Sequence, residues 1–274
     1  MKSVKFLLAA VALCFGFSAS AQDFSDDNLY GKWGATAEER ASNIGASNFL
    51  KEAMDAKDYA AATVNFQQLL QNCPAASVNT FTRGTTLYKN RINRARNLDE
   101  KRRLVDSLML IHDLRIEYFG DDAKYGRDYI LDLKARDVNK YCSTNRELLR
   151  STLKEAVYAA QAANTVKLDI VALYFKALCD DYRTEESITP DMLLDEYQTL
   201  AVYFENVTDE KDLANKKTFE ASFVNSGAAN CENIEQLYKE KIAANPDDVE
   251  LIKKAVSLMS RQNCSSDLYF EITA

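Results

Sequence analysis

The sequence predicts an all-α fold, an α-α superhelix in which antiparallel helix pairs stack on one another. Only three prolines and eight glycines interrupt 274 residues, and no segment sustains the apolar-polar alternation of a half-buried strand. A helical pattern also returns late in the chain. Its two prolines, Pro74 and Pro246, are separated by close to five periods of about 34 residues, a spacing typical of stacked helix-turn-helix units.

The first 21 residues have the pattern of a secretory signal. Lys2 and Lys5 precede an apolar run over residues 6–17, and Ala-Ser-Ala at 19–21 forms a small-residue cleavage site. We therefore expect export to the periplasm or the medium, with a mature chain that begins at Gln22. The apolar run is shorter than the roughly 20 residues that span a bilayer, so no stable membrane insertion is expected.

The charge balance argues against a nucleic-acid partner. Removing residues 1–21, which hold two lysines and no acid, changes the formal net charge from −7 to −9. Phosphate binding needs clustered cations, and the densest run, Lys101-Arg102-Arg103, lies beside Asp99 and Glu100. We interpret this run as a solvated helix face with partners of opposite charge nearby.

Composition predicts a flexible lead-in over residues 22–35 and one helical-repeat domain over 36–274, because no Pro/Gly/Ser-rich linker follows. Helix starts are indicated where a capping side chain stands three residues before an acid. Four such pairs occur: Thr36 with Glu39, Asn97 with Glu100, Thr144 with Glu147, and Asp247 with Glu250. Thr189-Pro190 marks a fifth start, with proline at the first helical position.

Helix pairs follow in order along the chain. The first covers residues 43–76 with its turn at 56–58, and the next ends in a long helix from Leu98 to Phe119 before Gly120. The segment after Pro190 carries an apolar stripe made of Leu193, Tyr197, Leu200 and Phe204. The remaining predicted pairs are 125–163, 165–206 and 215–248, followed by a unit that opens at Val249 with a second helix near Ser265.

The most specific motif lies in the second helix of the first pair. It consists of Tyr59, Ala62, Phe66, Leu69 and Pro74, and a weaker copy contains Ile234, Tyr238 and Pro246. In these residues the chain resembles the tetratricopeptide-repeat family, in particular exported bacterial members with divergent repeats. It departs from the family in the first helix, where Ala46, Phe49 and Leu50 replace the usual Trp, Leu and Gly.

The resemblance implies a curved surface whose first helices line a groove for a protein or peptide partner. Carried over by position, the groove residues are Lys51, Met54, Phe219, Phe223, Lys253 and Ser257. Phe219 and Phe223 have a second interpretation, because aromatic pairs at this spacing more often form the core between repeats. The chain ends within a helix, and repeat arrays need a closing unit, so we expect further sequence or another chain to cover the C-terminal face.

Five cysteines follow the signal, and export makes their oxidation chemically reasonable. In the repeat register Cys231 and Cys264 fall at the helix turns of consecutive units, which predicts a disulfide between them. Cys142 and Cys179 have a looser version of this relation, and Cys73 is then the odd thiol. The alternative for both pairs is that they are buried apolar residues.

No catalytic, cofactor or metal site is predicted. The single histidine, His112, favours a capped or exposed helical side chain over a catalytic base, and no glycine-rich phosphate loop or paired cysteine motif is present. The leading hypothesis is therefore a non-catalytic exported interaction scaffold. The alternative is a carbohydrate-binding or glycan-processing solenoid, which the single tryptophan, Trp33, disfavours because such proteins often expose several.

Overall fold

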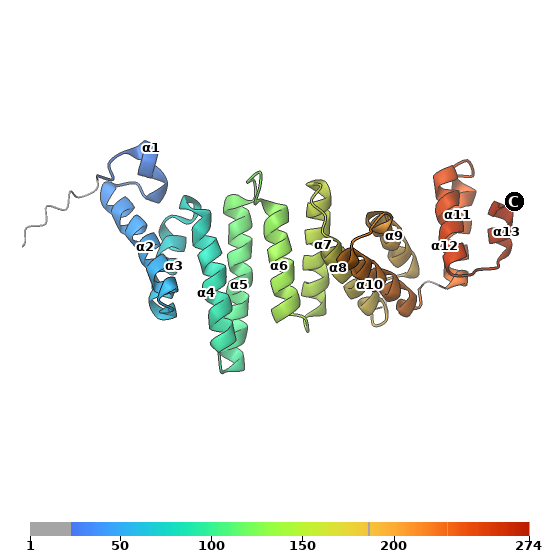
Figure 1. The fold of residues 1–274 in the computed structure, drawn as a ribbon, viewed down its shortest axis with the longest axis horizontal. Helices are drawn as coiled ribbons and strands as arrows, with labels where there is room; N and C mark the ends of the chain where they lie inside the picture. The colour runs from blue at the N-terminus through green and yellow to red at the C-terminus, as the bar shows by residue number, and fades with distance from the viewer. Residues whose placement is uncertain (1–22, 186, 229, 274) are drawn as a thin grey trace, which may run out of the picture. The chain divides into compact units, whose positions relative to one another are not determined.

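The structure is a computed structural model that describes residues 23–185, 187–228 and 230–273. The predicted signal over residues 1–21 lies outside this range. The described residues form helices and no strand, so the predicted all-α class is confirmed (Figure 1). The α-helices are α1 Asp27–Tyr30, α2 Ala37–Asp55, α3 Tyr59–Asn72, α4 Val78–Arg94, α5 Leu98–Phe119, α6 Arg127–Tyr141, α7 Arg146–Ala162, α8 Leu168–Tyr182, α9 Pro190–Ala201, α10 Glu210–Ser226, α11 Cys231–Ala244, α12 Val249–Arg261 and α13 Asp267–Thr273. Three 3-10 turns accompany them: η1 Gly31–Trp33, η2 Pro74–Ala76 and η3 Val202–Phe204.

Contacts between residues divide the chain into two compact units. Unit 1 ends at Ala76 and unit 2 begins at Ser77, which differs from the single domain expected from residue 36 onward. In both units helices adjacent in sequence pack against each other in pairs, as α2 does with α3, α4 with α5, and α6 with α7. This pairing is the helical-repeat arrangement that the sequence predicts, because each hairpin buries an apolar face that it cannot bury alone.

Unit 1 is built on the hairpin of α2 and α3. Residues 56–58 form the predicted turn, and the Asp58 carboxylate caps α3 by accepting a 3.0 Å hydrogen bond from the Ala61 amide. The motif residues Ala62, Phe66 and Leu69 are at most 1% exposed, because their three- and four-residue spacing puts them on one helix face. The motif is therefore the part of α3 that packs on α2.

Residues 23–35, the described part of the expected flexible lead-in over residues 22–35, are held against α2, which corrects that expectation. Arg40 of α2 is 5% exposed and forms an ion pair with Asp27 of α1. Its guanidinium also donates hydrogen bonds of 2.8–3.2 Å to the carbonyls of Phe24, Ser25, Gly34 and Ala35. The composition of the segment could not predict this order, because the hydrogen-bond donors come from a single arginine in the next helix.

The predicted helix starts are largely reproduced. Thr36 forms a full capping box with Glu39, Asn97 caps α5, and Thr189 caps α9 with Pro190 in its first turn. Two starts were wrong by one residue, since Asn145 caps α7 in place of Thr144, and Asp248 caps α12 in place of Asp247. In both cases the capping oxygen accepts from an amide three residues later, which only the residue next to the first turn reaches.

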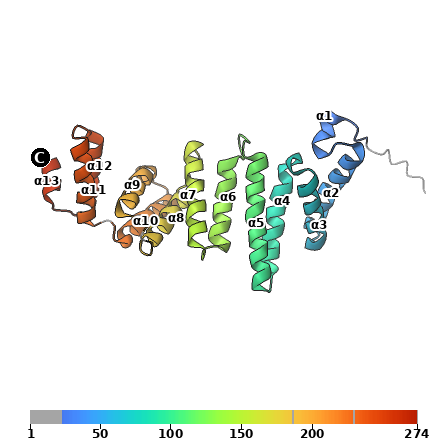
Figure 2. The ribbon, with the colours of Figure 1, turned by 180° about the vertical axis from the view of Figure 1, so that it is seen from behind.

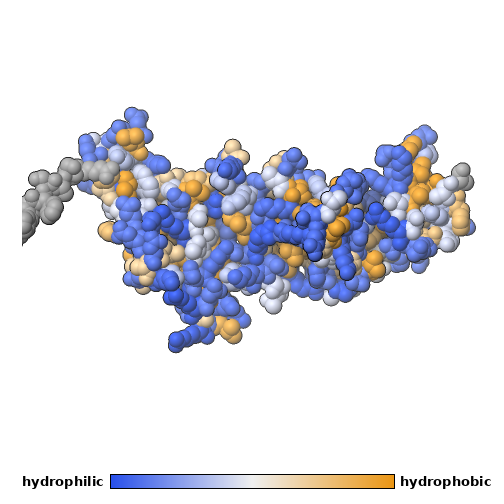
Figure 3. Space-filling model, in the orientation of Figure 1, coloured by the Kyte–Doolittle hydropathy of each residue, from blue (hydrophilic) through white to orange (hydrophobic). Residues whose placement is uncertain are grey.

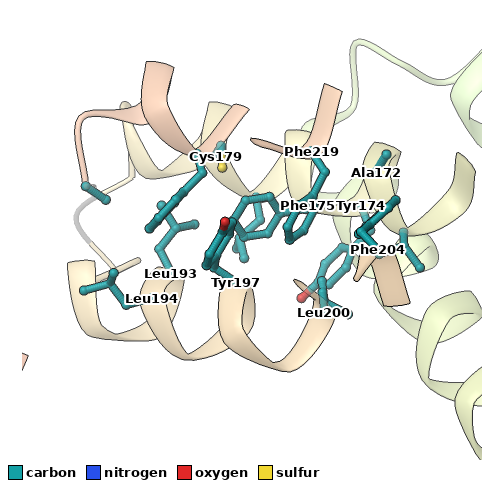
Figure 4. Close-up of a cluster of buried hydrophobic side chains, with 14 of the residues drawn as sticks. Ala172, Tyr174, Phe175, Cys179, Leu193, Leu194, Tyr197, Leu200, Phe204 and Phe219 are labelled. Atoms are coloured by element: carbon teal, nitrogen blue, oxygen red, sulfur yellow. The ribbon is translucent and has the colours of Figure 1, made fainter. Parts of the chain in front are cut away.

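Helix pairing in the second half of unit 2 differs from the prediction. The pair at 125–163 is present as α6 and α7, but α8 packs most closely on α10, and α11 packs on α12. The predicted pairs 165–206 and 215–248 therefore join helices that are not each other's main partners. The cause is an aromatic cluster, shown in Figure 4, in which Phe175 of α8 lies 4.5 Å from Phe219 of α10 between ring centres.

The last three helices form a group closed by a disulfide. Cys231, the first residue of α11, is bonded to Cys264 in the loop between α12 and α13, and their Cα atoms are 5.4 Å apart. The predicted bridge is therefore present in the structure. The other three described cysteines, Cys73, Cys142 and Cys179, are free, so the looser pair is not bonded. Burial raises the pKa of the Cys179 thiol to about 12, which makes it a poor nucleophile.

Candidate binding surface

The six predicted groove residues are divided between the two compact units. Lys51 and Met54 belong to α2 in unit 1, where Lys51 is exposed and pairs with Asp55 at 2.7 Å. The other four belong to unit 2. Within unit 2, two of the four side chains are buried and two line a hollow, so these four do not form one surface.

Phe219 and Phe223 are core residues, which corrects their assignment to a groove. Each is 1% exposed. Tyr197 of α9 stacks on both rings, with centre-to-centre distances of 5.1 Å to Phe219 and 4.1 Å to Phe223. Phe204 adds a further stacked contact at 4.8 Å to Phe219 (Figure 4). Their i,i+4 spacing on α10 places both rings against α8 and α9, so they belong to the core and do not project as ligand anchors.

Lys253 and Ser257 do line a surface hollow. They are exposed on α12, and with the C-terminal end of α9 and η3 they enclose about 260 Å³, which we name the α9–α12 groove. Its apolar part is formed by Ala201, Val202 and Leu258. Val202 is 51% exposed, which is a large exposure for an aliphatic side chain inside a concave site.

The helical periodicity of α12 explains how the groove is built. Ala255, Leu258 and Met259 are buried, which turns that stripe of the helix toward the protein. Lys254 and Arg261, seven residues apart, then lie along one line of the helix at the groove. The disulfide at Cys264 holds the chain just after this helix against the start of α11.

The polar side chains of the groove are partly satisfied. Lys253 pairs with Glu250 at 2.9 Å, and Arg261 donates a 3.3 Å hydrogen bond to the Tyr197 hydroxyl. Burial raises the pKa of Tyr197 in spite of the nearby arginine, so its hydroxyl stays neutral. Lys254 and Glu205 make no ion pair within the described residues. Among the described residues, the groove thus offers two cations without an ion pair, Lys254 and Arg261, and one such anion, Glu205, beside an apolar strip.

A second cavity of about 190 Å³ lies among α6, α7 and α8. Its floor includes Val157 and Val171, and its polar edge includes Asp128 and Asp132. These carboxylates already have protein partners, because Lys167 lies 2.6 Å from Asp132 and the Thr165 hydroxyl donates to Asp128 at 2.7 Å. The cavity is therefore less suited than the α9–α12 groove to hold a polar ligand.

His112 is not the exposed or capped side chain that the sequence favoured. It is fully buried on α5, and its Nε2 lies 2.9 Å from the Asp137 carboxylate of α6, which also receives Lys89 of α4 at 2.8 Å. Sequence reasoning missed this triad because its members are far apart in the chain. A buried imidazole hydrogen-bonded to a carboxylate that also pairs with Lys89 has the geometry of a structural link between three helices.

Comparisons with protein-family models, with curated proteins and with solved structures found no match to this chain. Within the described ranges, no helix combines the length and apolarity needed to cross a membrane. The same residues contain no group of three side chains from His, Cys, Asp and Glu arranged to hold a metal ion.

Proposed function

We propose that this chain is a non-catalytic, tetratricopeptide-like scaffold that binds an extended segment of a protein partner in the α9–α12 groove. The observation that carries the proposal is the groove itself, an exposed hollow that combines an apolar strip with unpaired Lys254 and Glu205. Lys253 and Ser257, two positions that the family resemblance implies for ligand contact, line it.

The chemistry of the groove suits a peptide. Apolar side chains of a bound segment pack on Val202 and Ala201, while Lys254 and Glu205 select a segment that carries charges of both signs at matching positions. The Arg261 guanidinium, held by Tyr197, offers its remaining N–H donors to peptide carbonyls or a carboxylate.

Export is part of the proposal. The secretory pattern over residues 1–21 predicts a mature chain from Gln22, and the disulfide between Cys231 and Cys264 suits an oxidising compartment such as the periplasm or the medium. The partner would then be a protein or peptide of the cell envelope or the exterior.

Selection of random peptides against the purified chain tests the groove. We expect the selected peptides to bind Lys254→Glu and Val202→Asp at least tenfold more weakly, which corresponds to about 1.4 kcal/mol. The matched control is Lys217→Glu on α10, an exposed lysine outside the groove, which should change binding less than twofold.

Two results would reject the proposal. The first is equal binding of the selected peptides to the groove variants and the control, because the ligand would then lie elsewhere. The second is saturable binding of a defined glycan with no enriched peptide, which would favour the carbohydrate-binding alternative.

A further inference from the structure

The end of the α4–α5 hairpin concentrates positive charge in an otherwise acidic chain. Residues 89–103 contain seven Lys or Arg and two acids, whereas the whole chain has a net charge of −7. The exposed cations come from the end of α4, the loop and the start of α5, and we name them the basic tip: Arg94, Arg96, Lys101, Arg102 and Arg103. Only the hairpin fold brings the two halves of this group together.

The basic tip projects from unit 2. With 22 residues, α5 is longer than α6 or α7, and its N-terminal end extends past theirs in both views of the ribbon (Figures 1 and 2). The space-filling view shows this end as a mainly hydrophilic surface with a small apolar spot (Figure 3). A convex end of this kind does not enclose a ligand, but it can contact a flat surface.

Fold stability does not account for these cations. A helix N-terminus carries partial positive charge, so Lys101, Arg102 and Arg103 stand near the end of α5 that favours acids. Arg102 lies 3.4 Å from Asp99, and both are 78% exposed, which makes this pair weak. Arg96, Lys101 and Arg103 form no ion pair with any described residue. Arg96, Lys101 and Arg103 are therefore available to an external anion.

Leu98 gives the basic tip an apolar apex. It is the first residue of α5 and is 71% exposed, directly after the Asn97 cap and two residues from Arg96. A leucine left in water beside cations has the pattern of a surface that enters the headgroup region of an anionic bilayer, where cations meet phosphates and the side chain meets acyl chains.

We propose that the basic tip attaches this protein peripherally to membranes rich in anionic phospholipid, with Leu98 inserted at the interface. Each Lys or Arg near such a surface strengthens binding about fivefold, so the group suffices for reversible attachment without a membrane span. A nucleic acid fits less well, because its phosphate backbone gains nothing from the exposed Leu98 side chain.

Vesicle co-sedimentation tests the attachment. We expect the purified chain to bind vesicles that contain phosphatidylglycerol and phosphatidylcholine in a ratio of about 3:7, and not to bind vesicles of pure phosphatidylcholine. High salt should release the bound protein, because it screens the attraction between the cations and the lipid phosphates. Arg96→Glu with Lys101→Glu should weaken binding at least tenfold. The control, Lys217→Glu with Lys239→Glu, makes the same charge change at exposed lysines of α10 and α11 and should have less than a twofold effect.

A fluorescence measurement tests the apex separately. Leu98→Trp should show a blue shift when anionic vesicles are added, a change absent from the wild type, whose only tryptophan is Trp33. Equal loss of binding in the tip and control variants would overturn the proposal, as would a failure to bind anionic vesicles. So would a tip variant that loses affinity for duplex DNA while it binds vesicles like the wild type.

Discussion

At the residue scale, buried charges connect helices that are distant in sequence. Asp137 is 5% exposed and receives both His112 and Lys89. Burial by itself would raise the pKa of this carboxyl, but the hydrogen bonds and charges of its two partners outweigh it and hold the pKa below its ordinary value of 3.8. The ionised form of Asp137 therefore stabilises the folded state.

Replacing this carboxylate tests its contribution. Asp137→Ala should lower the free energy of unfolding by about 3 kcal/mol at pH 7, because the substitution leaves the buried His112 and the half-buried Lys89 without their acceptor. Since the folded pKa is depressed, the wild-type contribution is complete above the unfolded value of 3.8 and is lost as the pH falls through the folded pKa. Denaturant unfolding should thus show a smaller difference at pH 3.

The exposed acid Asp106 on α5 provides the control for this measurement, and Asp106→Ala should change stability by less than about 0.5 kcal/mol. If the difference between Asp137→Ala and the wild type were the same at pH 7 and pH 3, the carboxylate would not be the stabilising species.

Arg40 makes a second prediction at this scale. Arg40→Met removes the donors that hold residues 24–35, so their amides should exchange with deuterium roughly tenfold faster or more, while α3 is unchanged. Hydrogen exchange followed by mass spectrometry measures this directly. Lys51→Met, an exposed change on the same helix, should leave the segment protected, and equal exchange in both variants would show that Arg40 does not order it.

At the element scale, aromatic packing decides which helices pair. Phe175, Tyr197 and Phe219 come from three helices and lie within 6 Å of one another between ring centres. Large buried rings remove much apolar area from water, and stacked or tilted pairs add a further attraction. This cluster outweighs the sequential pairing that the repeat period suggests.

Truncation of one ring tests its place in the core. Phe219→Ala should lower the free energy of unfolding by about 3 to 5 kcal/mol, since it leaves a cavity among large side chains. Phe270→Ala, at a position 59% exposed, is the matched control and should cost less than about 0.5 kcal/mol. Chemical denaturation compares the two, and similar values would contradict the assignment of Phe219 to the core.

The disulfide belongs to the same scale because it joins α11 to the segment after α12. A bridge across 33 residues stabilises the folded state by about 3 to 4 kcal/mol on loop entropy. Dithiothreitol should therefore lower the thermal midpoint of the wild type but not of Cys231→Ala with Cys264→Ala. Alkylation of Cys231 in the non-reduced folded protein would show that the bridge does not form.

At the scale of the whole molecule, the chain is organised as two compact units that divide after Ala76. Each unit has its own buried residues, represented by Phe66 in unit 1 and Phe219 in unit 2. Because most stabilising contacts stay within a unit, the two units need not unfold together.

Calorimetry tests this organisation. We expect two thermal transitions, with Phe66→Ala lowering one midpoint and Phe219→Ala lowering the other. Phe49→Ala, at a position in unit 1 that is 59% exposed, should move neither. One shared transition that both core variants shift equally would show that the chain unfolds as a single cooperative body.

The sequence by itself determined the local features of this protein. Helix starts at Thr36, Asn97 and Thr189 depend on side chains within three residues of the first turn, and the buried face of α3 follows from the spacing of Ala62, Phe66 and Leu69. These interactions act over about one helical turn, so periodicity and capping patterns were sufficient to predict them.

Only the tertiary structure decided which distant side chains meet. It buried Phe219 where a groove was expected, placed His112 against Asp137, and gathered the cations of two helices at one hairpin end. Such contacts depend on the competition among all apolar faces for partners and on the desolvation of charges, which involve the whole chain at once. A local sequence pattern therefore does not predict which long-range contacts form.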